Sequence, residues 1–191
     1  MPVITITLIE GYDEATRRRL SESLTDAARS VIAAPLDGVT VLVNEVAPAN
    51  YMRGRQSRTP GPPLPAPQEV VEAFLKAMQA RDLQAARKFL SDDFIMTFPG
   101  DVSFTRLEQL VDWAKTRYRS IAKTYERFDH LTTEDESVVY CFGTLGGEWC
   151  DGRAFSGVRF IDRFTLQNGL LTTQLVWNDL AELARGNQPF P

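Results

Sequence analysis

Pro2 is the residue of this sequence whose position offers the most distinctive chemistry. Removal of Met1, which is usual when a small residue such as proline follows it, would give Pro2 a free secondary amine. An apolar pocket pushes such an amine toward its neutral form, because desolvation disfavours the charged one. A neutral amine near pH 7 can act as a general base on a carbon acid beside a carbonyl. If Met1 stays in place, Pro2 is an amide nitrogen and cannot act as a base.

A second candidate lies in the alternating segment 159–164, near the carboxyl end of the chain. Asp162 shares one face of an extended strand with Phe160 and Phe164, because side chains alternate between the two faces. Asp162 is therefore predicted to point, together with aromatic side chains, into the concave side of a sheet. The histidine of the sequence, His130, could be a base or an ordinary surface residue, and we favour the second interpretation.

Residues 59–67 divide the elements that must position these groups. Five of these nine residues are proline. Proline has no N–H to donate to a helix or a sheet, and it holds the residue before it in an extended conformation. The segment is therefore predicted to be a semi-rigid linker between two domains, residues 1–58 and residues 68–191.

The first unit shows a strand–helix–strand pattern. Residues 3–8 alternate as a half-buried strand, Asp13 is the expected N-cap of a helix that reaches about Ala33, and residues 39–46 form the second strand. The apolar face of the helix is predicted to carry Leu20, Leu24, Ala27, Ala28 and Val31. The pattern predicts a β-α-β unit with parallel strands. About 58 residues bury too little apolar surface to be stable alone, so we expect this unit to self-associate.

Motifs along the whole first unit carry a family resemblance. They are Pro2, Ile4, Ile6, Leu8-Ile9-Glu10-Gly11, Ala34-Pro35-Leu36, Val39, Val41 and Asn44-Glu45-Val46. In these residues and their spacing the unit resembles the 4-oxalocrotonate tautomerase family. The resemblance implies an amino-terminal proline base, a β-α-β protomer and assembly into a trimer or hexamer.

Two positions depart from that family. Where the founding enzyme has arginines that hold a dicarboxylate, this sequence has Tyr12 and Thr40. A dianion without bidentate arginines would be poorly held, so we expect monocarboxylates or neutral enols as substrates. Tyr51 matches the aromatic wall residue of the family. Tyr12, Arg53 and Arg55 of a neighbouring copy of the chain are the candidates to supply the substrate-binding donor in place of the missing arginines.

The second unit begins with helices and ends with long strands. Helices are predicted from Pro67, over 83–90 and around 107–113. Strands are predicted around 94–98, in an alternating pattern from 128 onward, and at 138–149, 154–167 and 170–180. Asp151-Gly152 and Asn168-Gly169 are hairpin signals, and Gly146-Gly147 predicts a bulge. The order predicts an α+β cone-shaped barrel, in which a curved antiparallel sheet wraps over helices with a pocket between them.

The second unit also carries a resemblance, in Phe74, Arg81-Asp82, Ser91-Asp92-Asp93, residues 157–164 before Asn168-Gly169, and residues 176–180. In these motifs it is similar to the SnoaL-like and ketosteroid-isomerase-like superfamily. The isomerases place a tyrosine and a base aspartate where this sequence has Phe74 and Phe98. Asp162 keeps their second aspartic acid, which donates a hydrogen bond to the developing oxyanion. Without the base, that isomerisation is not expected here.

Epoxide hydrolases of the same fold use an Asp-Arg-Asp set. Asp179 matches the last of these residues, but the other two positions fall near Tyr140 and Phe142, which cannot replace them. Asp162 and Asp179 are therefore the acid–base candidates of this unit. Aromatic residues either line a pocket for a flat apolar ligand or belong to the core: Phe74, Phe98, Trp113, Tyr118, Trp149 and Trp177.

Composition excludes several classes of protein. The net charge is −4, and neither unit has the basic excess of a nucleic-acid binder. No apolar run approaches the length of a membrane span, and the start of the chain lacks the features of a signal peptide. Two cysteines, Cys141 and Cys150, are too few for a disulfide framework or a metal quartet. We expect a cytoplasmic protein with reduced thiols, without a metal or cofactor and without nucleic-acid or membrane partners.

Together these features predict a two-domain enzyme that acts on small keto or enol compounds. Pro2 would be the general base for tautomerisation, and the second pocket would serve a reaction that the sequence leaves open. The alternative is a non-catalytic protein that binds a small hydrophobic ligand. In that case the tautomerase-like unit would serve oligomerisation alone.

Overall fold

The computed structural model describes residues 1–185 and separates into two compact units, residues 1–63 and residues 64 onward. The boundary lies within the proline-rich segment. Each end of this segment packs on a glycine of its own unit: a Cβ built on Gly11 would lie 2.7 Å from Pro60 Cγ, and one on Gly169 would lie 2.9 Å from Pro65 Cγ. Both glycines have positive φ, 136° and 81°, which side chains disfavour. Glycine is therefore required at both contacts.

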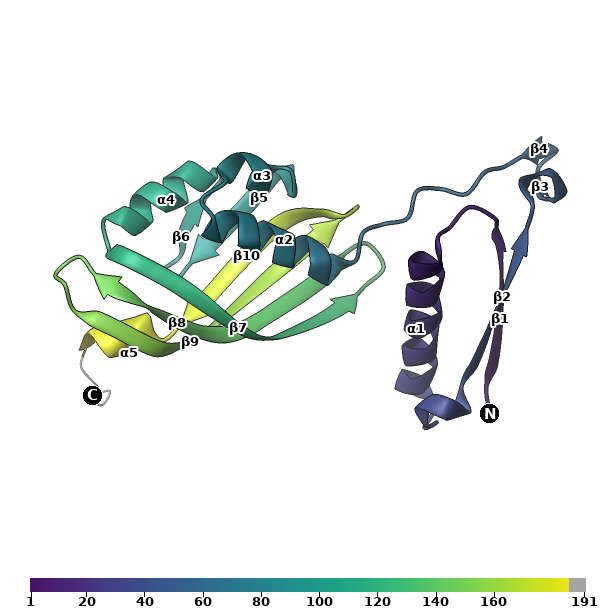
Figure 1. Ribbon diagram of the computed structural model, residues 1–191, viewed down its shortest axis with the longest axis horizontal. Coiled ribbons are helices and arrows are strands. Elements are labelled where there is room, and N and C mark those ends of the chain that lie inside the picture. Colours follow the sequence, from purple (N-terminus) through teal and green to yellow (C-terminus); the bar gives the residue numbers. More distant parts are fainter. Residues whose placement is uncertain (186–191) are drawn as a thin grey trace. The chain divides into compact units, whose positions relative to one another are not determined.

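The first unit consists of β1 (Val3–Ile9), α1 (Glu14–Val31), β2 (Thr40–Val46) and the short strands β3 (Met52–Arg53) and β4 (Gln56–Ser57). Strands β1 and β2 pair in parallel, from Val3 opposite Thr40 to Ile9 opposite Val46. The predicted N-cap is confirmed, because the Asp13 carboxylate accepts a hydrogen bond from the backbone N–H of Thr16 at 2.8 Å. Helix α1 lies along the strand pair (Figure 1). The predicted β-α-β unit is therefore confirmed.

The single chain leaves this unit without a buried core. None of residues 1–63 is buried. Val31 is 86% exposed, so its predicted place on the packed face of the helix is wrong for one chain alone. Leu36 and Leu42 are also exposed. Each strand of the pair has one edge that pairs with no other strand among the described residues, which makes both edges available for association.

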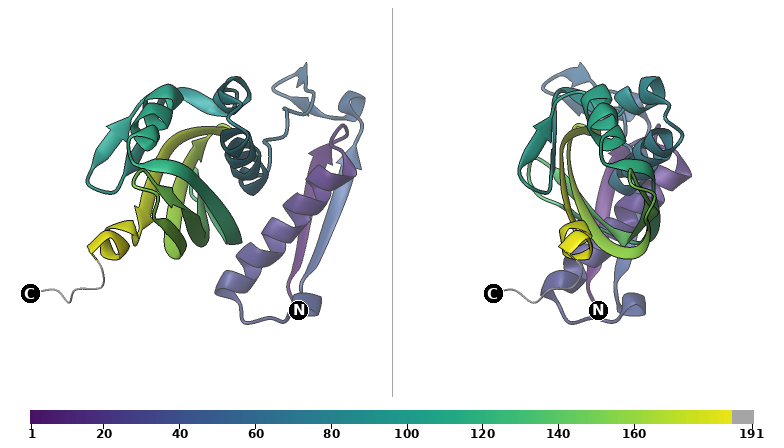
Figure 2. Two further views of the ribbon diagram at one scale, coloured as in Figure 1. Left: turned by 60° about the vertical axis from the view of Figure 1, so that its left-hand side comes forward. Right: turned by 90° about the vertical axis from the view of Figure 1, so that its left-hand side faces the viewer.

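The second unit is larger and contains α2 (Pro67–Gln79), α3 (Leu83–Arg87), β5 (Leu90–Phe98), β6 (Val102–Phe104), α4 (Leu107–Lys115), β7 (Tyr118–Thr132), β8 (Ser137–Trp149), β9 (Ala154–Gln167), β10 (Leu170–Asn178) and α5 (Leu180–Arg185). Its six described strands form one sheet in the order β6-β5-β10-β9-β8-β7. Figure 2 shows the sheet curving around its concave side, with α2 and α4 across the opening. The predicted α+β fold, a curved sheet over helices, is confirmed.

The turn and bulge signals of the sequence are also found in the structure. Asn168 and Gly169 both have positive φ, 51° and 81°, which a type I′ hairpin requires. Gly152 has a φ of 92° in the turn between β8 and β9. The register of β8 against β9 shifts between Leu145 and Gly147, where the bulge was predicted.

Three details differ from the prediction. Helix α3 ends at Arg87, because Leu90 already pairs with Leu171 of the sheet. Strand β7 begins at Tyr118, ten residues before the predicted start of the alternation. Two register shifts in β7 interrupt its period of two, and so conceal it in the sequence. Strands β5 and β10 pair in parallel, so the sheet is not wholly antiparallel.

The core lies between the concave face of the sheet and α2. Phe74 is 1% exposed, and its ring lies 6.2 Å from that of Phe94 and 5.9 Å from that of Phe164, both edge-to-face. Such pairs contribute about 0.5–1.5 kcal/mol beyond their buried area. Cys141 is buried in the same core and Cys150 is exposed, and both are free thiols. Among residues 1–185, no helix is both long and apolar enough to cross a membrane.

Candidate functional site

The second unit holds a cavity of about 180 Å³ under α2 and α4. Its apolar walls come from both helices and from the strands opposite them. They include Phe74, Leu75, Met78, Phe98, Leu110, Trp113, Tyr118, Ile121, Leu145, Val176 and Leu180. Polar side chains enter at Gln79, Arg81, Lys123, Tyr125, Gln174 and Asn178. A mostly apolar cavity with a few polar groups is typical of a small-molecule site.

One side of the cavity is an aromatic cluster. The Trp113 ring centre lies 5.5 Å from that of Phe98 and 5.6 Å from that of Phe104. The Arg117 guanidinium lies 4.5 Å from the Trp113 ring centre, in a cation–π contact. Trp113 is therefore fixed by its neighbours and presents a rigid aromatic surface.

The main polar feature at the cavity is the ion pair between Lys123 and Asp162. Lys123 lines the cavity with 22% of its side chain exposed, whereas Asp162 is 0% exposed and lies behind it. The same carboxylate oxygen, Oδ2, also accepts a hydrogen bond from the Gln174 amide at 3.3 Å. The Lys123 ammonium lies 4.3 Å from the Phe160 ring centre. The ammonium is thus held between a carboxylate and an aromatic face.

Strand geometry explains this arrangement. Asp162 alternates with Phe160 and Phe164 on the buried face of β9, as the sequence predicts, and lies opposite Cys141 of β8. The other oxygen of the carboxylate, Oδ1, is buried and accepts no hydrogen bond from the described residues. Unsatisfied buried acceptors are uncommon in folded proteins. Among the described residues, Lys123 is the one cationic side chain that pairs with Asp162 and balances its charge.

Two further groups near Asp162 are held in their protonated forms. Burial raises the pKa of the Tyr125 phenol well above its ordinary value, and the Asp162 charge raises it further. Burial and Asp162 likewise raise the pKa of the Cys141 thiol to about 12. Tyr125 is therefore a hydrogen-bond donor at the cavity wall, and Cys141 is an inert core thiol.

The structure gathers some of the predicted residues of this unit and separates others. Phe74, Phe98 and Trp113 line the cavity. Trp177 is 51% exposed and does not line it. Asp179 also lies outside it, and its carboxylate accepts a hydrogen bond from Arg159 Nε at 2.7 Å at the surface. Asp162 and Asp179 therefore do not form a pair of acids in one site.

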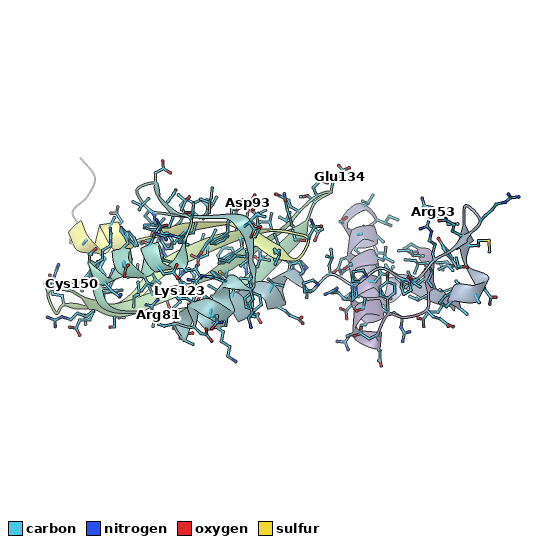
Figure 3. The ribbon with its side chains drawn as sticks, turned by 90° about the horizontal axis from the view of Figure 1, so that it is seen from above. Arg53, Arg81, Asp93, Lys123, Glu134 and Cys150 are labelled. Atoms are coloured by element: carbon cyan, nitrogen blue, oxygen red, sulfur yellow. The ribbon has the colours of Figure 1, made fainter. Side chains whose placement is uncertain are left out.

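The sequence did not predict that Lys123, Gln174 and Arg81 line the cavity. Figure 3 labels Lys123 and Arg81, the two cations among the described lining residues. Lys123 lies in the part of β7 that the sequence analysis left unassigned. A signal was present, because Lys123 alternates with Ile121 and Tyr125, and a lysine on an apolar strand face needs a buried partner.

In the first unit, Pro2 stands at the head of β1. It is partly buried, and its carbonyl oxygen accepts a hydrogen bond from the backbone N–H of Thr40 at 3.0 Å. Thr40, one of the two positions at which the sequence departs from the family it resembles, is therefore beside Pro2. The geometry fixes the start of β1 against the start of β2.

The other predicted residues of this unit lie at its far end. Tyr12 follows β1, and Tyr51, Arg53 and Arg55 follow β2. Because β1 and β2 run parallel over seven paired positions, these two ends are separated by about 20 Å at roughly 3.3 Å per residue. Figure 1 shows the amino terminus at one end of the strand pair, with β3 and β4 beyond the other. One chain alone cannot bring Pro2 together with these residues.

Comparison with known proteins agrees with this division into two units. Residues 2–58 match the tautomerase enzyme family, and residues 71–174, more than half of the chain, match the SnoaL-like domain family. A probable tautomerase of Ralstonia nicotianae is 41% identical over 51 residues, which are 27% of this chain and 73% of that protein. The chain belongs to the tautomerase and SnoaL-like families. Its first unit is a tautomerase domain, and its second is a SnoaL-like domain.

Solved structures resemble the SnoaL-like domain in fold. An NTF2-like protein of unknown function from Burkholderia pseudomallei has a TM-score of 0.51 at 19% identity, over 62% of this chain and 95% of that one. An NTF2-like protein from Burkholderia thailandensis has a TM-score of 0.53 at 15% identity, over 66% of this chain and 100% of that one. TerC, crystallised with polyporic acid, has a TM-score of 0.52 at 16% identity, over 63% of this chain and 97% of that one. These likenesses show the NTF2-like fold.

The two domains offer different chemistry. The tautomerase domain carries the candidate base, Pro2, but Pro2 does not line the pocket formed in that domain by residues 48–49 and 57–59. The SnoaL-like domain has a cavity with hydrogen-bond donors, but none of its described lining residues is a carboxylate or a histidine. Within residues 1–185 there is also no cluster of three or more histidine, cysteine, aspartate or glutamate side chains that could hold a metal ion.

Proposed function

We propose that the protein is a two-domain enzyme of keto–enol chemistry. Pro2, freed by removal of Met1, is its general base for tautomerisation. The observation that carries the proposal is the position of Pro2, at the head of β1 and at the start of the match to the tautomerase family. The relative from Ralstonia nicotianae, named as a probable tautomerase, supports it. General bases contribute roughly 10²–10⁴-fold to such reactions.

The tautomerase site is completed between copies of the chain. The separation of Pro2 from Tyr51, Arg53 and Arg55 supports this, since a second copy is needed to bring such groups to Pro2. The absence of any buried residue in 1–63 supports it too, because association would cover the exposed apolar side chains. We therefore propose a homo-oligomer, a trimer or hexamer, built through residues 2–58, in a reducing compartment such as the cytoplasm.

The substrate of the tautomerase site is a small enol with one carboxylate or none. Tyr12 and Thr40 stand where the family's arginines would hold a dicarboxylate. A cation from Arg53 or Arg55 of a neighbouring copy suits a monoanion and stabilises the developing enolate. We expect a dicarboxylate to be turned over less efficiently than its monocarboxylate analogue. A tenfold preference for the dicarboxylate, about 1.4 kcal/mol in transition-state binding, would contradict this.

Turnover of phenylenolpyruvate tests the proposal. Intact mass first establishes that Met1 is absent from the purified protein. Pro2→Ala should then lower kcat/KM by at least about 100-fold, since it replaces the secondary amine by an ordinary primary one. Arg153→Gln is a matched control, because Arg153 lies in a surface turn of the other domain and pairs with Asp151. Retained Met1 together with full activity, or an unchanged rate in Pro2→Ala, would refute the proposal.

A second candidate function is non-catalytic binding of a small hydrophobic ligand. It is favoured by the lack of a carboxylate or histidine among the described residues that line the SnoaL-like cavity. The tautomerase domain would then serve oligomerisation alone. The same assay separates the two functions, because turnover that disappears in Pro2→Ala is incompatible with a purely structural tautomerase domain.

A further inference from the structure

The charge of the SnoaL-like cavity carries an inference about its ligand. Two cationic side chains, Lys123 and Arg81, line the cavity, and none of the described residues that line it is acidic. Asp162 balances Lys123 from behind the wall, with no exposed surface of its own. A ligand that enters the cavity therefore meets ammonium and guanidinium groups but no carboxylate. Such a lining favours anions, because Arg81 and the positive end of the Lys123–Asp162 pair face the cavity.

Lys123 retains donor capacity for a ligand. An ammonium has three N–H donors, and Asp162 is the hydrogen-bond acceptor that Lys123 contacts among the described residues. The Phe160 ring, 4.3 Å away, and the carboxylate behind it fix the position of the ammonium. The remaining N–H groups can donate to an oxygen in the cavity. Charge-assisted hydrogen bonds of this kind are roughly twice as strong as neutral ones.

Arg81 has a different place in the cavity. It follows the C-terminus of α2, has a positive φ of 59°, and is exposed. No ion pair involves its side chain within residues 1–185. Because it is exposed and also lines the cavity, it lies at the open side. Arg81 is thus available to attract an anion from solvent, while Lys123 lies further inside.

The size of the cavity limits the ligand. Its volume is about 180 Å³. An engineered apolar cavity of about 150 Å³ in another protein accommodates benzene. The cavity here therefore has room for one aromatic ring with a short side chain. Trp113, Phe98 and Phe74 supply the aromatic surfaces that such a ring would contact.

We propose that the SnoaL-like cavity binds monocyclic aromatic acids. The ring contacts the aromatic wall, and the carboxylate or enolate oxygen accepts hydrogen bonds from Lys123. Arg81 at the open side raises the local concentration of the anion. Asp162 is a positioning residue, which acts through Lys123. This inference rests on the proposed function in one respect: an enolisable aryl acid would be a ligand common to both domains. Binding in the SnoaL-like cavity does not require turnover by the tautomerase domain.

Calorimetric titration with phenylacetate and with phenylacetamide tests the inference. The two probes have nearly the same shape, and only the first is an anion. The titrations use the full-length chain that carries Pro2→Ala, Arg53→Gln and Arg55→Gln, so that neither the proposed base nor the proposed cations of the tautomerase site contribute to binding. The acid should bind at least about tenfold more tightly than the amide at low salt, and the ratio should fall as salt is added. Equal affinities, or binding of neither probe, would overturn the inference.

Two variants locate the effect. The double change Lys123→Met with Asp162→Asn removes both charges of the pair without leaving either unpaired, and should bring the acid-to-amide ratio close to one. Arg81→Asn removes the exposed cation at a positive-φ position that asparagine tolerates, and should lower the ratio a few-fold. Arg153→Gln, in a surface turn that does not line the cavity, should leave the ratio unchanged. An undiminished ratio in the double variant, or in Arg81→Asn if the double variant does not fold, would overturn the inference.

The two proposals fail in distinguishable ways. Loss of the charge preference in binding, together with Pro2-dependent turnover, would refute this inference and leave the proposed function in place. Charge-selective binding without any turnover of phenylenolpyruvate would refute the enzymatic function and leave the inference in place.

Discussion

The two domains of this chain differ in what one copy can complete. The SnoaL-like domain buries its own core around Phe74 and forms its own cavity. The tautomerase domain has no buried residue in one copy, and its candidate groups lie at opposite ends of a strand pair. The difference follows from size, because a β-α-β unit of about 60 residues buries a smaller fraction of its surface than a domain twice as long.

The chemistry is divided in the same way. The tautomerase domain supplies a candidate base, but one copy does not bury it in an apolar pocket. The SnoaL-like domain supplies a mostly apolar cavity with hydrogen-bond donors, but none of the described residues that line it is a carboxylate or a histidine. A base needs desolvation to be neutral near pH 7, and a cavity needs a base to abstract a proton from carbon. We therefore propose that association completes the site of the first domain and that ligand charge governs binding in the second.

The largest effect should come from removing the tautomerase domain. Deletion of residues 1–67 should lower the order of the oligomer, because assembly is proposed to run through residues 2–58, and the remaining domain should stay folded around its own core. Light scattering gives the mass of each form, and circular dichroism reports folding of the truncated one. A 21.5 kDa monomer for the full-length chain at micromolar concentration would contradict assembly through the tautomerase domain.

Next in size is the effect of separating Lys123 from Asp162. Lys123→Met leaves the fully buried Asp162 without its cation, and should lower the free energy of unfolding of the SnoaL-like domain by about 3–5 kcal/mol. Urea denaturation measures the change. The double variant with Asp162→Asn should recover much of the loss, because no uncompensated charge remains. A double variant that is less stable than Lys123→Met would show that the two residues do not act as a pair.

Sequence patterns predicted the fold well, because local signals and the global fold agree in this chain. Asp13 as an N-cap, the Asn168-Gly169 turn and the bulge near Gly146-Gly147 each depend on a few adjacent residues. The start of β7 was missed because its register shifts interrupt the alternation. The parallel pairing of β5 with β10 joins segments far apart in the chain, and no local pattern encodes it.

The candidate site was only partly predictable. Asp162 was chosen by analogy with the isomerases, and strand alternation placed it correctly on the buried face. Its partner Lys123 lies thirty-nine positions earlier in the chain, and that contact depends on how β7, β8 and β9 align. Asp179 was chosen by analogy, and the structure places it in a surface pair with Arg159. Contacts between residues so far apart in the sequence are not encoded in any local pattern, so the sequence alone could not predict them.

Smaller effects should come from the two glycines that contact the linker prolines. Gly11→Ala and Gly169→Ala each place a Cβ against a proline ring at positive φ, and each should cost about 1–3 kcal/mol. Gly11→Ala should destabilise the tautomerase domain alone, and Gly169→Ala the SnoaL-like domain alone. Hydrogen exchange resolved by segment measures the two domains separately. Loss of protection in both domains from either single change would contradict their independence.

The smallest effect is expected at the other sequence-derived acid. Asp179→Asn should change the free energy of unfolding by less than about 1 kcal/mol, since the Arg159–Asp179 pair is exposed and surface ion pairs contribute little. It should also leave binding of phenylacetate unchanged, because Asp179 lies outside the cavity. Calorimetric titration checks the second point. A tenfold loss of affinity in Asp179→Asn would place the binding site elsewhere than proposed.

Subunit mixing tests the central claim, that one domain is completed between copies while the other is complete in one chain. Pro2→Ala protein and protein with Arg53→Gln and Arg55→Gln should each be inactive on phenylenolpyruvate. Unfolded, mixed in equal amounts and refolded together, they should regain roughly a quarter of the wild-type activity, because that share of sites receives Pro2 from one copy and the arginines from another. A mixture as inactive as its two components would contradict a site shared between copies.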